Sequence, residues 1–121
     1  MYYLLSRYIL LENDMAPDRD REILRDLARQ VLDTAHAPTQ DERRRLWRAF
    51  HNLQPERPML YVETGMPLGE CLRGQVECED PFYRRYEVAL RGELFHHDVG
   101  DDYVVEPWIT MPASYVVPEA G

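Results

Sequence analysis

The chain has 121 residues, which is enough for one domain with a core but not for a complete enzyme barrel of about 250 residues. Its 22 acidic and 14 basic residues give a formal net charge of −8, which argues against nucleic-acid binding because phosphate contact needs a basic surface. Cys71 and Cys78 lie seven apart, a spacing that is not typical of a zinc site. Without a sign of secretion we expect reduced thiols in a cytoplasmic protein, with a disulfide between them as the alternative.

The first 14 residues, MYYLLSRYILLEND, form an apolar N-terminal extension. It is too short to span a bilayer, and it lacks the basic start and the cleavage site of a signal peptide. We therefore expect no membrane contact. Three alternatives stay open for the extension: it packs on the core of its own chain, it packs on a second copy, or it precedes a natural start at Met15.

Residues 15–55 are predicted to form a helical hairpin. The first helix runs from Pro17 to about Ala35, with apolar residues along one half of its circumference. Thr39 and Glu42 have the spacing of a capping box for the second helix. Two prolines end that helix.

Residues 56–121 are predicted to form a partial βαβ unit. The apolar runs Met59–Val62 and Tyr103–Val105 are continuous rather than alternating, which is typical of buried parallel strands. Between them, Asp80 and Pro81 indicate the start of a long helix, and Gly100 indicates its end.

The expected fold is therefore α/β: a helical hairpin followed by a βαβ unit that is like the incomplete start of a (β/α)8 barrel, with α+β as the alternative. A few parallel strands with helices on one side would leave a sheet face and two edges bare. We therefore expect a homo-oligomer, or a partner chain that completes the barrel, with a homodimer as the simplest form.

Two glutamates are the candidate catalytic pair. Glu63 and Glu106 each follow a predicted strand, and the carboxyl ends of parallel strands meet at one edge of a sheet. There they could serve as general acid and base, or each could be a turn residue that faces water. The candidate ligand-binding residues are Trp108, Cys71 in the glycine-containing loop, and Arg57.

No metal site is predicted. His96 and His97 are adjacent on a helix, so their side chains diverge by about 100° and do not readily share one ion. A role at the helix C-terminus is expected for them instead. Gly92 lies inside the same helix and marks either a close packing contact or a tolerated defect.

Several short sequence blocks follow one another along the chain. They are RLWR (45–48), HNLQP (51–55), RPMLYVE (57–63), CEDP (78–81) and DDYVVEPW (101–108). With these blocks in this order, the chain between about Asp18 and Trp108 resembles the N-terminal third of a group of bacterial proteins in the uroporphyrinogen decarboxylase / corrinoid methyltransferase superfamily.

The resemblance implies a (β/α)8 barrel that decarboxylates porphyrinogens or moves methyl groups between corrinoids and thiols. It implies no catalytic or zinc residue here, because those of the family lie late in the chain, and a corrinoid cofactor is suggested by resemblance alone. We therefore expect an N-terminal segment that is not catalytic alone and that self-associates or completes a partner. The alternatives are a small-molecule binding module and a small α+β enzyme that uses Glu63 and Glu106.

Overall fold

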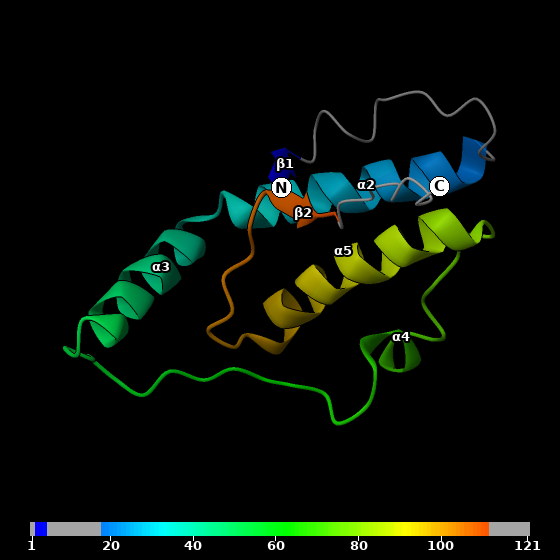
Figure 1. The fold of residues 1–121 in the computed structure, drawn as a ribbon. Helices are drawn as coiled ribbons and strands as arrows, with labels where there is room; N and C mark the ends of the chain where they lie inside the picture. Colours follow the sequence, from blue (N-terminus) through cyan, green and yellow to red (C-terminus); the bar gives the residue numbers. More distant parts are fainter. Residues whose placement is uncertain (1, 5–17, 112–121) are drawn as a thin grey trace, which may run out of the picture.

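The computed structural model describes residues 2–4 and 18–111, and these residues are mostly helical (Figure 1). Within the described ranges, four helices and two three-residue strands follow one another. In order they are β1 (Tyr2–Leu4), α2 (Asp18–Ala35), α3 (Pro38–His51), α4 (Leu68–Cys71), α5 (Pro81–Val99) and β2 (Trp108–Thr110).

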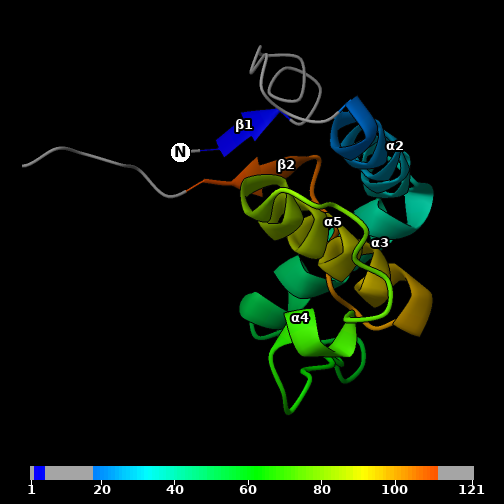
Figure 2. The same ribbon diagram turned by 90° about the vertical axis from the view of Figure 1, so that its right-hand side faces the viewer.

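The two longest helices, α2 and α5, lie side by side and enclose the core (Figures 1 and 2). The apolar face predicted for the first helix is buried as expected. Burial of each such side chain stabilises the fold by about 2 kcal/mol, so the α2–α5 contact is the main source of stability. The buried cluster consists of Leu24, Leu27, Ala28, Val31, Ala35, Cys78, Leu90, Val105 and Ile109.

Both ends of α5 confirm the sequence prediction. The Asp80 carboxylate accepts a hydrogen bond of 2.8 Å from the amide of Phe82, and Pro81 occupies the first turn. Gly100 follows the helix with a φ of +74°, a conformation that favours glycine because it has no Cβ. Of the two alternatives for Gly92, the structure shows the close packing contact, since a Cβ there would overlap a methyl group of Leu68 on α4.

The start of α3 differs from the prediction. The residue before the helix is Ala37, and no side chain caps the free amides of the first turn. The predicted capping box of Thr39 and Glu42 is therefore wrong. Pro38 takes the first helical position instead and moves the helix start one residue ahead of Thr39.

The predicted βαβ unit and the barrel start are wrong. Residues 59–62 and 103–105 have no strand pairing, and the strands that the structure does describe, β1 and β2, pair antiparallel with Tyr3 opposite Ile109. The amides of the predicted strands bond to side chains instead: Leu60 to Asp102, and Val105 to Gln40. Polar side chains thus take the place of a second strand, and residues 2–4 and 18–111 form no parallel sheet, so the fold is α-helical rather than α/β or α+β.

The predicted helical hairpin also needs correction, because α2 packs along α5 and not along α3. In Figure 1, α3 diverges from α2 and points away from the α2–α5 pair. A long extended segment, residues 54–67, then returns from the end of α3 to α4. Of the predicted N-terminal extension, Tyr2–Leu4 pair within this chain as β1, and residues 5–17 lie outside the described residues.

Candidate functional site

Residues 101–106, the link between α5 and β2, are held by side chains of α3. Arg43 donates a hydrogen bond of 3.1 Å to the carbonyl of Tyr103, and the indole Nε1 of Trp47 donates one of 2.7 Å to the carbonyl of Asp102. Buried Gln40 accepts one of 2.9 Å from the amide of Val105. These bonds fix the link in one conformation, and the groups described next all contact it.

Arg57 and Asp102 form a two-pronged ion pair between the extended segment and this link. The guanidinium donates to both carboxylate oxygens of Asp102 at 2.9 and 2.6 Å, and the amide of Leu60 donates a third hydrogen bond at 2.7 Å. The Arg57 guanidinium lowers the pKa of Asp102 to about 2; burial opposes this shift and the Leu60 amide adds to it. Arg57, a predicted ligand-binding residue, is therefore occupied within the protein.

His96, in the last turn of α5, forms a pair with Asp101. Its Nδ1 lies 2.7 Å from Oδ2 of Asp101, whose side chain is fully buried. The same carboxylate accepts hydrogen bonds from the amides of Val62 at 3.0 Å and Tyr103 at 3.1 Å. Three donors therefore converge on Asp101 and hold it in place.

The charge on Asp101 determines which nitrogen of His96 carries the proton. Burial alone would raise the pKa of Asp101, but the hydrogen bonds from Val62, His96 and Tyr103 outweigh it, and the pKa is lowered. An ionised carboxylate only accepts hydrogen bonds, so Nδ1 of neutral His96 is the donor. Nε2 is then the acceptor, and it has no hydrogen-bond partner among the residues described.

Aromatic rings hold the imidazole of His96 from two sides. The ring of Tyr103 stacks on it with centroids 4.1 Å apart and planes inclined by 16°, and the ring of Tyr61 lies 5.2 Å away. The hydroxyl of Tyr103 donates a hydrogen bond of 2.8 Å to Glu93. Burial raises the pKa of the Glu93 carboxyl and that of the Tyr103 hydroxyl above their ordinary values. These contacts hold the His96 ring in one orientation.

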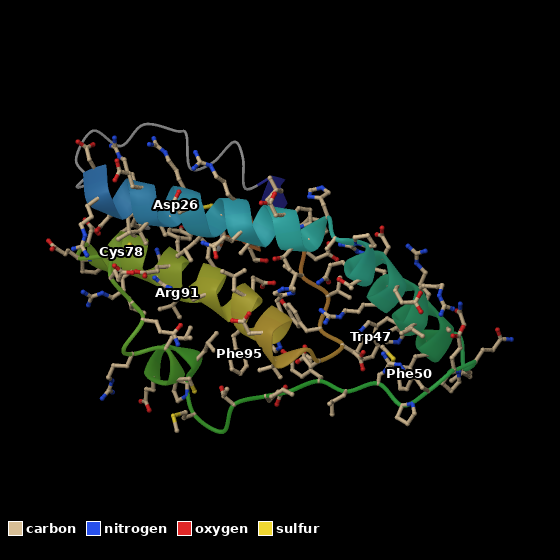
Figure 3. The ribbon with its side chains drawn as sticks, turned by 180° about the vertical axis from the view of Figure 1, so that it is seen from behind. Asp26, Trp47, Phe50, Cys78, Arg91 and Phe95 are labelled. Carbon is tan, nitrogen blue, oxygen red and sulfur yellow. The ribbon has the colours of Figure 1, made fainter. Side chains whose placement is uncertain are left out.

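His96 lines a hollow of about 240 Å³ beside the extended segment. Phe95, labelled in Figure 3, extends from α5 towards this segment. Glu63, one of the predicted catalytic residues, is exposed and also lines the hollow. The full lining consists of Tyr61, Val62, Glu63, Thr64, Leu68, Phe95 and His96.

The predicted pair of Glu63 and Glu106 does not share this hollow. Glu106 lines a separate one of about 410 Å³ together with Trp108, His36 and Arg44. There the guanidinium of Arg44 binds Glu106 at 3.2 Å. Glu106 and Trp108 therefore lie together as neighbours in the chain, whereas the two glutamates belong to different surfaces.

The two cysteines are both free. Cys71 is exposed at the end of α4, and Cys78 is buried in the core. Burial raises the pKa of the Cys78 thiol to about 12, with the neighbouring carboxylate of Glu87 as a second cause. Cys78 is therefore an unreactive packing residue, and Cys71 lines none of the three hollows described in this section.

Two buried carboxylates that sequence reasoning missed hold the turn before α5. Asp20 on α2 accepts hydrogen bonds from the amides of Glu79 and Asp80 at 3.1 and 2.9 Å. Glu87 accepts one of 2.7 Å from the amide of Cys78. Both side chains are fully buried, and both serve to join elements of the fold rather than to face a ligand.

A third hollow, of about 420 Å³, lies between α2, α5 and the loop after α4. Asp26 and Arg91, labelled in Figure 3, border it from the two helices. Arg91 is already paired with Glu87 at 2.8 Å and with Glu77 at 3.3 Å. Its charge is therefore satisfied within the protein.

Within residues 2–4 and 18–111, no group of three or more His, Cys, Asp or Glu side chains has the arrangement of a metal site. In the same part of the chain, none of the helices combines the length and the apolar character needed to cross a membrane.

Comparisons with models of protein families, with curated proteins and with solved structures each find no match to this chain. The resemblance to the decarboxylase and methyltransferase superfamily therefore stays a prediction from the sequence blocks.

Proposed function

We propose that this chain is an interaction module, not catalytic by itself, that associates with a second copy through the extended segment after α3. The observation that carries the proposal is the position of the exposed apolar side chains. Of seven large apolar side chains that are exposed among the described residues, five lie within residues 50–66, which we call the apolar segment. They are Phe50, Leu53, Leu60, Tyr61 and Met66.

An uncovered parallel sheet is not the reason for association, because the described residues form no such sheet. The apolar segment supports it instead. Leu53 is 89% exposed and has a φ of +59°, a left-handed conformation that is uncommon for a bulky residue, and Leu60 is 62% exposed. Burying one such side chain against a partner contributes about 2 kcal/mol.

The backbone of the apolar segment is paired on one side. The amides of Leu60 and Val62 donate to the carboxylates of Asp102 and Asp101, at 2.7 and 3.0 Å. The amides of the intervening residues, 59, 61 and 63, have no partner in the described part of the chain. In an extended chain alternate amides face opposite sides, so this second edge is open to another strand.

A second copy fits this edge for a geometric reason. A two-fold axis places two identical edges antiparallel, so that each supplies the donors and acceptors that the other lacks. In the register that places the two copies of Leu60 opposite each other, residue 59 of one copy lies opposite residue 61 of the other, and their outward amides and carbonyls can form hydrogen bonds. The same register places Arg57 of one copy opposite Glu63 of the other.

A cysteine at position 60 tests the register directly. The two copies of residue 60 would form a pair without hydrogen bonds between them, with Cα atoms about 4.5 Å apart, which a disulfide can bridge. In a Cys71→Ser background, Leu60→Cys is expected to give a disulfide-linked dimer under mild oxidation. Leu53→Cys is the matched control, since it is more exposed but lies outside the pairing. Equal cross-linking of both, or none at position 60, would contradict the proposal.

The resemblance to the decarboxylase and methyltransferase superfamily suggests which part of a larger protein this chain corresponds to. We propose that it acts as an amino-terminal segment that self-associates or docks on a partner polypeptide, and that the apolar segment is the surface that becomes covered. A module without the family's chemistry should show no thermal shift with a corrinoid, a porphyrin or a thiol. A specific shift with one of them would favour the small-molecule alternative.

We also propose a cytoplasmic location. Its support is that both cysteines are free thiols, which is typical of proteins kept in a reducing compartment.

A further inference from the structure

We propose that the hollow beside His96 binds a small cationic nitrogen compound, an amine or an amidine, with a flat apolar body. The proposal rests on the kinds of polar atom that the hollow offers. It goes beyond the proposed self-association, although residues 61–64 of the lining also belong to the apolar segment.

Most of the polar side chains around this hollow offer acceptors to a ligand. Nε2 of neutral His96 is an acceptor because Nδ1 is held as the donor to ionised Asp101. Glu63 adds an exposed carboxylate. The hydroxyl of Thr64 donates its proton to the carbonyl of Met66 at 2.7 Å, and the hydroxyl of Tyr61 can either donate or accept. A ligand that supplies hydrogen-bond donors therefore meets most of these groups.

The lining also sets the sign of the ligand's charge. Among the described residues, no Lys or Arg lines the hollow, so an anion would meet the Glu63 carboxylate without a neighbouring cation to neutralise it. A cation gains from Glu63, and it gains further from the aromatic faces of Tyr61 and Phe95. Val62 and Leu68 supply apolar contact for the body of the ligand.

The volume limits the size of the ligand. At about 240 Å³ the hollow lies just below the range of about 300–1,000 Å³ that is usual for drug-sized molecules. A compound with one ring and one cationic group is therefore the expected class. Affinity in such a small, open site is expected to be weak, with a Kd on the order of 1 mM.

Benzamidine and benzoate provide a matched pair of probes, because they share one ring and carry opposite charges. Titration of the full chain, followed by ¹H–¹⁵N spectra of the histidine ring nitrogens and by methyl spectra of Leu68, is expected to show saturable shifts with benzamidine and none with benzoate. Shifts of equal size with both probes, or no shift with benzamidine up to 20 times the expected Kd, would overturn the proposal.

Two variants separate the polar contacts from the overall fold. Glu63→Gln is expected to weaken benzamidine binding about fivefold, whereas Glu70→Gln, an exposed acid on α4 that does not line the hollow, leaves it unchanged. Asp101→Asn removes the charge that fixes the tautomer, so the ¹⁵N shifts of His96 should show the proton moving towards Nε2 as binding is lost. Unchanged affinity in both Glu63→Gln and Asp101→Asn would refute the assignment.

Discussion

Replacing Asp102 with Asn removes the charge that joins the extended segment to the link between α5 and β2. The side chain of Asp102 is 9% exposed, and it accepts two hydrogen bonds from Arg57 and one from the amide of Leu60. Asn keeps the shape but replaces one acceptor oxygen with a donor, so one of these bonds is lost and the ion pair disappears.

The size of the effect follows from the pKa of Asp102. The Arg57 guanidinium is the largest cause of its fall from 3.8 to about 2, against the opposing effect of burial. At 1.36 kcal/mol per pKa unit, this corresponds to about 2 kcal/mol. The true value is expected to be somewhat smaller, because the side chain of Arg57 is 47% exposed and water screens the pair.

The sign of the pH dependence is fixed by the direction of the shift. Because the folded pKa of Asp102 is depressed, its stabilisation is fully present above pH 4 and is lost as the pH falls towards about 2. Between pH 4 and pH 2 the Asp102 carboxylate binds a proton more readily in the unfolded chain than in the folded chain, so acid favours unfolding. The gap in unfolding free energy between the wild type and Asp102→Asn should therefore shrink between pH 4 and pH 2.

Urea unfolding followed by far-ultraviolet circular dichroism at several pH values measures this gap. Asp98→Asn is the control, because Asp98 is exposed and accepts no hydrogen bond from a described residue while the change in charge is the same. We expect Asp102→Asn to lose about 1.5 kcal/mol at pH 7 and Asp98→Asn to lose less than about 0.5 kcal/mol. Equal losses, or a gap that does not shrink in acid, would refute the reasoning.

Three further substitutions test other parts of the fold. Asp20→Ala removes the acceptor for two main-chain amides that precede α5, so it should lower the free energy of urea unfolding by about 3 kcal/mol. A loss below about 1 kcal/mol would contradict this role of Asp20. Gln40→Ala leaves the buried amide of Val105 unpaired and should cost about 2 kcal/mol in the same assay, with faster hydrogen exchange at that amide. Gly92→Ala gains about 1 kcal/mol of helix propensity but displaces a methyl group of Leu68, so stability should change little while the Leu68 methyl resonance shifts; an unshifted resonance would argue against the contact.

The helices could be predicted because their signals are local. Asp80 and Pro81 at the start of α5, and Gly100 at its end, act on the adjacent backbone and need no distant partner. The predicted strands depend on what lies beside them. The apolar runs at residues 59–62 and 103–105 look like buried strands, but their pairing is decided by side chains that are distant in the sequence, such as Gln40, which is 65 residues from Val105.

The candidate site follows the same rule. The sequence places Glu63 and Glu106 together only through a parallel sheet, and because the described residues form no such sheet, the two glutamates line different hollows. The position of His96 predicts a role at the helix C-terminus, although the sequence also contains a local signal for its pairing with Asp101. Gly100 turns the chain back after α5, and this turn brings Asp101, which is five residues after His96, to the imidazole.

Self-association through the extended segment is the central claim, and the solution mass tests it most directly. Light scattering on the purified chain over a range of concentrations should give twice the chain mass of 14.4 kDa, and Leu60→Asp should reduce it to the monomer value. A mass of 14.4 kDa for the wild type at every concentration up to the millimolar range would contradict the account.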